Sequence, residues 1–169
     1  GEDNISWPGK IKWFAKSSGT TNDKSKFIPV SNEALSFNHF NAGKDLLSVH
    51  LNNYPNSKIF KGKSLAVGGS RQISPLDNNI FTGDISAVLI KNLPIWARFF
   101  RTPPMKIALM SDWENKIDRM AAIASKQNIT SISGVPTWTI VLIKKILELN
   151  KCDNILELWP NLELFIHGA

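Results

Sequence analysis

Residues 10–16 alternate between polar and apolar side chains, with Phe14 breaking the pattern, and after residue 31 the apolar spacing becomes helical. Over residues 10–16, Ile11, Trp13 and Ala15 fall on one face of an extended segment and the lysines on the other, which predicts a half-buried strand. A second short strand is expected over residues 26–30. Ser31 then stands where a helix cap is expected, and the helix is predicted to run to about Asn53.

The spacing of apolar residues predicts the buried face of the first helix and the elements that follow it. The apolar face of the first helix is expected to carry Leu35, His39, Ala42, Leu46 and Val49. Beyond it we expect a strand at 64–69, a helix at 84–90, a helix at 112–127 capped by Asp112, a strand at 129–133, a helix at 137–150 and a strand at 162–167. The last three elements read strand, helix, strand, so their strands should be parallel. The predicted class is α/β, with a mixed sheet and flanking helices.

The segment between the first two predicted strands carries the most distinctive chemistry. Asn22 and Asp23 suit a tight turn there, and Gly19 allows close backbone approach. Hydroxyls, backbone N–H groups and cations packed this closely suit phosphate oxygens. The sequence therefore predicts a phosphate-binding hairpin loop made of Ser17, Ser18, Gly19, Thr20, Thr21, Lys24 and Lys26.

Composition and charge narrow the classes of protein to which the chain could belong. The chain has 169 residues, 43% hydrophobic and 20% charged, which is typical of a globular domain. Its net charge is +6, and nine cations against five acids in residues 1–63 indicate an anionic partner, a nucleotide or a nucleic acid. No apolar stretch approaches the roughly 20 residues of a membrane span, and no secretory signal is evident. A cytoplasmic setting is expected.

Several other features have plainer interpretations. Gly62-Lys63-Ser64 resembles the end of a Walker loop, but Ser57 stands where that motif needs glycine, and a strand is predicted to follow. Cys152 and the three histidines show no spacing typical of a nucleophile or a metal site. The six tryptophans are expected in the core.

Two arginines suggest a second candidate site. Arg98 and Arg101 flank aromatic residues, a mixture that could hold an acid with an apolar body. The alternative is that their stems cover apolar surface.

The loop and several later motifs resemble one family. Residues 17–29 resemble the phosphate loop of the acyl-acid amido synthetases, the auxin-responsive Gretchen Hagen family of adenylate-forming enzymes, and its bacterial branch in particular. The likeness extends to Ile132–Trp138 and Trp159–Leu162. It departs at Asn22 and Asp23, where relatives often carry glycine.

The resemblance implies an ATP-dependent reaction in two steps. A carboxylate attacks the α-phosphate of ATP to give acyl-AMP, and an amino acid then displaces AMP. Mg²⁺ assists, and Lys26 would counter the phosphate charge. Relatives carry adenine and ribose motifs that are missing here. Residues 1–169 are therefore expected to be one partial domain, a fragment of a larger adenylating domain, inactive alone and inclined to self-associate.

Two alternatives remain open at this stage. The first is another adenylate-forming enzyme, which would join the acyl group to coenzyme A, because the loop does not choose the acceptor. The second is a basic nucleic-acid-binding module, which only the charge supports.

Overall fold

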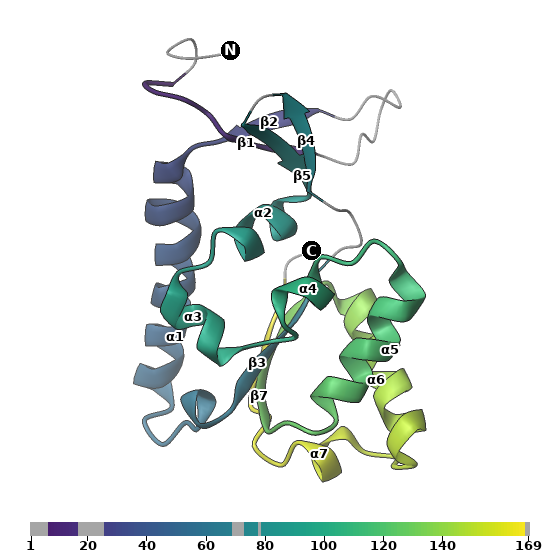
Figure 1. Ribbon diagram of the computed structural model, residues 1–169. Coiled ribbons are helices and arrows are strands. Elements are labelled where there is room, and N and C mark those ends of the chain that lie inside the picture. Colours follow the sequence, from purple (N-terminus) through teal and green to yellow (C-terminus); the bar gives the residue numbers. More distant parts are fainter. Residues whose placement is uncertain (1–6, 17–25, 69–72, 78, 168–169) are drawn as a thin grey trace. The chain divides into compact units, whose positions relative to one another are not determined.

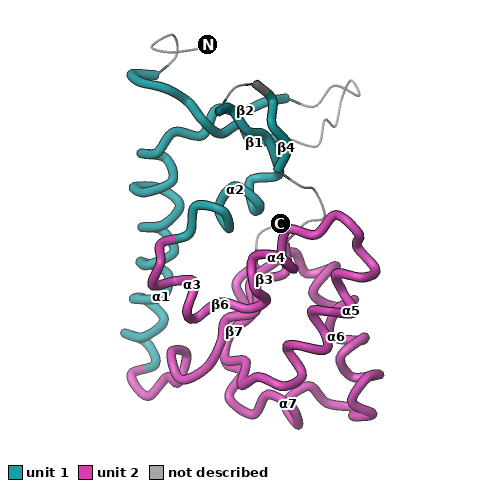
Figure 2. Tube along the Cα trace, in the orientation of Figure 1, with its two compact units in different colours: residues 1–54, 71–93 teal, residues 55–70, 94–169 magenta. Residues whose placement is uncertain are grey.

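The computed structural model describes residues 7–16, 26–68, 73–77 and 79–167. The chain divides into two compact units, each described below by itself (Figure 2). Unit 1 comprises Gly1–Tyr54 and Arg71–Leu93, and unit 2 comprises Pro55–Ser70 and Pro94–Ala169. That both units belong to one larger domain stays a prediction.

Unit 1 is built on a mixed sheet of four strands in the order β2-β1-β5-β4 (Figure 1). β1 pairs antiparallel with β2 and parallel with β5, while β4 pairs antiparallel with β5. The helical segments are a π-type helix η1 and two α-helices. The bounds are β1 Trp13–Lys16, β2 Phe27–Val30, η1 Ala34–Phe40, α1 Asn41–Asn53, β4 Ser74–Asp77, β5 Ile80–Gly83 and α2 Ile85–Lys91.

The start of the first helix matches the sequence prediction, but its apolar face does not. Ser31 Oγ accepts a hydrogen bond from the Ala34 N–H at 3.1 Å, so the predicted cap is confirmed. Leu35 is buried, whereas Leu46 and Val49 are exposed. The prediction assumed a regular helix with one buried face, but η1 takes the wider π-type turn, and no side chain of α1 is buried in the structure.

β1 is buried on both faces rather than on one. Ile11 and Phe14 cluster with Ile80 on one side. Ala15 packs with Val30 and the helices on the other side. Phe14, which breaks the alternation in the sequence, therefore fills a second small core.

Unit 2 contains a fully parallel sheet of four strands in the order β6-β3-β7-β8. The parallel pairing expected for the last two strands is confirmed, with Ile132 opposite Phe165. The bounds are η2 Ile59–Lys61, β3 Lys63–Val67, α3 Ile95–Phe100, β6 Arg101–Thr102, α4 Met105–Ala108, α5 Trp113–Ala124, β7 Ile129–Gly134, α6 Pro136–Asn150, α7 Ile155–Leu158 and β8 Leu164–Ile166.

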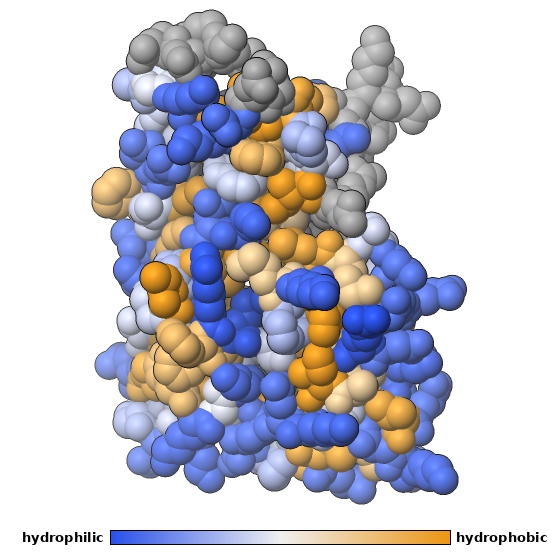
Figure 3. All heavy atoms as spheres, in the orientation of Figure 1, coloured by the Kyte–Doolittle hydropathy of each residue, from blue (hydrophilic) through white to orange (hydrophobic). Residues whose placement is uncertain are grey.

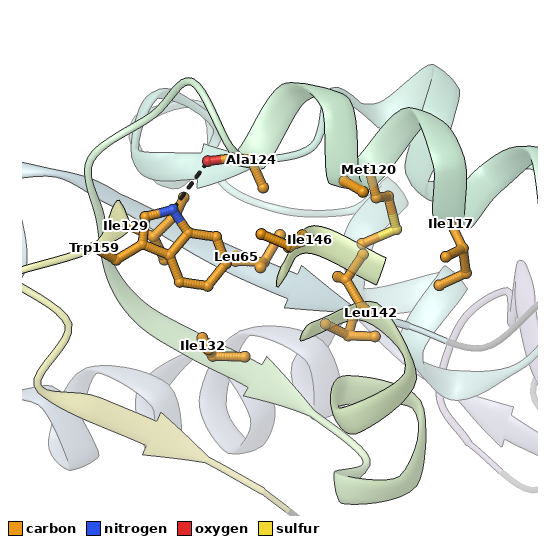
Figure 4. Packing of buried hydrophobic residues seen from close by; sticks show 11 residues of the cluster. Leu65, Ile117, Met120, Ala124, Ile129, Ile132, Leu142, Ile146 and Trp159 are labelled. Atoms are coloured by element: carbon orange, nitrogen blue, oxygen red, sulfur yellow. Dashed lines mark hydrogen bonds between the residues drawn. The ribbon is translucent and has the colours of Figure 1, made fainter. Parts of the chain in front are cut away.

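The core of unit 2 lies between this sheet and helices α5 and α6 (Figure 4). Leu65 of β3, Met120 of α5 and Ile146 of α6 are each almost completely buried. Trp159 is fully buried, and its Nε1 donates to Ala124 O at 3.1 Å, so the indole adds apolar bulk without leaving a polar atom unpaired. The expectation that all tryptophans are core residues is wrong for Trp7, Trp96 and Trp138, which are exposed.

Local sequence signals set both ends of the helices in unit 2. Asp112 accepts from the Asn115 N–H at 3.1 Å and caps α5, as predicted. Pro136 opens α6 at a position where its missing N–H costs nothing. Among the described residues, every helix is too short or too polar to cross a bilayer.

Gly134 is the tightest point of the parallel sheet. Its φ is +155°, and an added Cβ would lie 2.4 Å from Val67 O and 2.9 Å from Val67 Cβ. The close approach of β7 to β3 at this position therefore requires glycine.

We expect Gly134→Ala to lower the free energy of unfolding by about 2–4 kcal/mol, through backbone strain and overpacking. Gly43→Ala is the control, because Gly43 lies in α1 with nothing within 4 Å of an added Cβ. The control should gain about 0.5–1 kcal/mol. Urea denaturation measures both, and equal stability of the two variants would show that the β3–β7 contact tolerates a methyl group.

Candidate functional site

The carboxyl ends of the parallel strands in unit 2 meet at one edge of the sheet. Val67, at the end of β3, lies opposite Gly134, at the end of β7. Ser133 lies opposite Ile166, the last residue of β8. In open parallel sheets ligands bind outside the carboxyl ends of the strands. This edge is therefore the first candidate for a functional site.

Lys116 brings a cation to this edge. It lies on α5 and is 1% exposed, and its Nζ donates to Gly68 O at 3.2 Å, just after β3. The Nζ also lies 5.7 Å from the centre of the Trp113 ring. A buried ammonium group is costly unless its donors are used, so these contacts hold the end of β3 against α5. Lys116 is not evident from the sequence as a site residue, because a lysine among polar helix residues indicates a solvated face.

The start of α6 lies beside the same strand end. β7 passes through Gly134 and Val135 directly into α6, whose first turn has no side-chain cap. The ring of Trp138 in that turn lies 4.3 Å from the ring of Trp113. This edge therefore combines a buried cation, uncapped helix N–H groups and two indoles.

The predicted phosphate loop falls largely outside the described residues. This applies to Ser17, Ser18, Gly19, Thr20, Thr21 and Lys24. The strands that flank the loop are described, and they pair antiparallel, with Lys16 opposite Phe27. The expected loop between two neighbouring strands is thus confirmed as a connection, while its phosphate chemistry stays a prediction.

Lys26 is exposed and directly precedes β2. A hollow of about 350 Å³ lies beside these strand ends, and its lining includes Lys16, Ile28 and His39. Lys26 lies in unit 1, whereas Arg98 and Arg101 lie in unit 2. The structure therefore describes the two predicted sets of site residues in separate units.

Arg98 and Arg101 differ in their surroundings. Arg98 lies on α3 and is exposed. Arg101 opens β6, and its Nη1 donates to Pro103 O at 2.8 Å. Burial lowers the pKa of the Arg101 guanidinium to about 10. Of the predicted pair, Arg101 is therefore the desolvated cation.

The Walker-like triplet is a structural element. Lys63 and Ser64 belong to β3, as the rejection of that motif assumed. An added Cβ on Gly62 would lie 2.4 Å from Asn128 O. Gly62 is therefore explained by close backbone packing.

A second hollow in unit 1, of about 400 Å³, is lined in part by Trp7, Phe37 and Glu33. Glu33 accepts from Trp7 Nε1 at 3.2 Å. Hydrogen bonds from the backbone, from Ser31 and from Trp7 lower the pKa of this carboxyl. Because internal contacts already engage the charged group, we assign no ligand to this hollow.

The comparisons with known proteins bear on the whole chain. A family model described as "GH3 family N-terminal domain" matches residues 1–169. A search of curated proteins finds no match.

Two similar solved structures carry related titles. "GH3.15 acyl acid amido synthetase" matches with a TM-score of 0.59 and 19% identity, over 86% of this chain and 25% of that chain. "AtGH3.15 acyl acid amido synthetase in complex with 2,4-DB" matches with a TM-score of 0.58 and 18% identity, over 83% and 24% of the two chains. These likenesses show the fold, and the chain spans about a quarter of the length of these structures.

Cys152 provides a test of the sequence interpretation that it is not a nucleophile. Burial, Glu157 and Asp153 raise the pKa of its thiol, so less thiolate is present at neutral pH than in a free cysteine. We expect the rate at which iodoacetamide alkylates Cys152 to rise with pH, and the pH of its midpoint should lie above that of free cysteine. Asp153→Asn should lower the midpoint, and Asp118→Asn, a change on α5, should leave it unaltered. A wild-type midpoint below that of free cysteine would identify an activated thiol instead.

Proposed function

Because the chain belongs to the GH3 family, we propose that it forms part of an ATP-dependent acyl acid amido synthetase. The observation that carries the proposal is the match of the family's N-terminal domain to all 169 residues. The fold supports it, through its likeness to two structures titled as acyl acid amido synthetases. The chain would be one part of a larger adenylating domain.

The proposed reaction begins with adenylation. An oxygen of the acid's carboxylate attacks the α-phosphorus of ATP, the bond to the β-phosphate oxygen breaks, and pyrophosphate leaves. The amine of an amino acid then attacks the acyl carbon, the bond to the AMP oxygen breaks, and the amine loses a proton. The carboxylate is already ionised near pH 7, so the first step depends mainly on position and on neutralising phosphate charge.

The predicted loop is assigned to the phosphates in this proposal. Ser17 to Thr21 would donate to the β- and γ-phosphate oxygens, and Lys24 and Lys26 would supply positive charge. The antiparallel pairing of β1 with β2 supports this, because it anchors both ends of the loop on a sheet. Lys26 is the exposed cation at the exit of the loop.

Mg²⁺ enters the proposal together with ATP. Within the described part of the chain, no group of three or more His, Cys, Asp or Glu side chains could hold a metal ion. Mg²⁺ is commonly held by one or two carboxylates and by the substrate's phosphates, so a dedicated protein cage is not needed. No residue of this chain is assigned as its ligand.

The reaction products test the function. A longer polypeptide that contains residues 1–169 should form an amide from ATP, a carboxylic acid and an amino acid, with release of AMP and pyrophosphate. A thioester formed only with coenzyme A would assign the chain to the alternative class of adenylate-forming enzymes.

Residues 1–169 alone should give no turnover and should scatter light as an associating species, because Phe37, Ile95 and Phe99 are about 70% exposed. Turnover by a monomer of this length would contradict the partial-site proposal.

Lys26→Ala in that longer polypeptide should slow ATP–pyrophosphate exchange at least tenfold, about 1.4 kcal/mol of transition-state stabilisation. Lys12→Ala is the matched control, because Lys12 is also an exposed lysine but lies before β1, on the other side of the loop. The control should exchange at the wild-type rate. Equal rates for both variants would remove Lys26 from the phosphate site.

A further inference from the structure

Arg101 is a cation whose hydrogen-bonding groups are only partly used. It opens β6, the edge strand of the parallel sheet, and lies opposite Ser64 of β3. Its Nη1 donates to Pro103 O at 2.8 Å, which fixes the plane of the guanidinium. Within the described part of the chain, Nε and Nη2 are shielded from solvent and have no hydrogen-bond partner.

The two unpaired nitrogens lie on the same side of the guanidinium. Nε and Nη2 form its side-on fork, whose parallel N–H groups match the two oxygens of a carboxylate. A single carbonyl oxygen would use only part of this fork, and a lysine has no equivalent geometry. The unpaired atoms therefore favour one ligand chemistry, a planar anion with two acceptors.

The charge of Arg101 is also left without compensation. Desolvation is the cause that lowers the pKa of its guanidinium, and no carboxylate of the described residues acts against it. A buried charge is retained at low cost only when it is paired and hydrogen-bonded. An incoming carboxylate would supply both the negative charge and the two missing acceptors.

The chain next to Arg101 offers apolar surface for the rest of such a ligand. Phe99 and Phe100, at the end of α3, are exposed, as is Phe60 of η2. The rings of Phe60 and Phe100 meet edge to face, with centroids 5.6 Å apart. Exposed hydrophobic atoms are visible among polar ones on the face drawn in Figure 3. Exposed aromatics on the segments that lead into β6 and β3, next to a desolvated cation in the chain, suit an acid with an apolar body.

We propose that the Nε–Nη2 side of Arg101 binds the carboxylate of an apolar carboxylic acid, whose body packs on Phe60 and Phe100. The inference rests on the proposed function, because a carboxylic acid is the first substrate of adenylation, and it assigns that substrate to a residue. Both nitrogens are shielded in the unliganded chain, so binding includes a side-chain rotation nearby.

The Nε–H resonance of Arg101 reports directly on this contact. In the protein labelled with ¹⁵N at arginine, Arg101→Lys identifies the resonance by its loss. Benzoate is the probe, and benzamide, a neutral molecule of nearly the same shape, is the matched control. We expect benzoate to shift the resonance saturably and benzamide to bind at least tenfold more weakly. No shift with benzoate, or equal binding of the two probes, would overturn the proposal.

Calorimetry with benzoate provides the second measurement. Arg101→Lys should weaken benzoate binding at least tenfold, whereas Arg119→Lys should match the wild type, because Arg119 is an exposed arginine on α5 that donates to Asn115. Unchanged binding by Arg101→Lys would also overturn the proposal. If Arg101→Lys does not fold, the comparison of benzoate with benzamide in the wild-type protein still tests whether the site selects a carboxylate. Product analysis with ATP tests the proposed function separately, so the two can fail independently.

Discussion

The parallel pairing of β3 with β7 is the constraint on which the rest of unit 2 depends. Parallel neighbours cannot be joined by a tight turn, so the chain must leave the sheet after β3 and return through helices before β7. Thr130 helps to fix the pair, since its buried Oγ1 donates to Ile59 O at 2.6 Å. Gly134 allows the final approach to Val67. Together they align the strand ends where Lys116 reaches Gly68.

Polar contacts in unit 2 fix positions that apolar packing leaves open. Hydrophobic burial is not directional, and the cluster around Leu65 and Met120 would tolerate small shifts of the helices. The bonds from Trp159 to Ala124 O and from Lys116 to Gly68 O do not tolerate such shifts. Arg101 is the exception, because two of its buried donors are unused within the described residues. That contrast is the reason for treating Arg101 as a binding residue.

The sequence predicted what local chemistry determines. Ser31 and Asp112 were recognised as caps because a cap depends on residues only three positions away. It did not predict Arg101–Thr102 as a strand, since two residues show no period. It misplaced Leu46 and Val49 because their spacing predicts a buried helix face, whereas no side chain of α1 is buried in the structure. Lys116 was missed because its burial arises from distant parts of the chain, and the chemistry of residues 17–25 stays a prediction.

The tilted, closely spaced indoles of Trp113 and Trp138 give the sheet edge an optical property of its own. Their ring centroids are 4.3 Å apart and their planes are inclined by 59°. Two identical chromophores this close and tilted share their excited states, and such coupling produces paired circular-dichroism bands of opposite sign. The bands depend on the angle between α5 and the first turn of α6. The protein therefore carries a built-in sensor of motion at the carboxyl ends of its strands, without an added label.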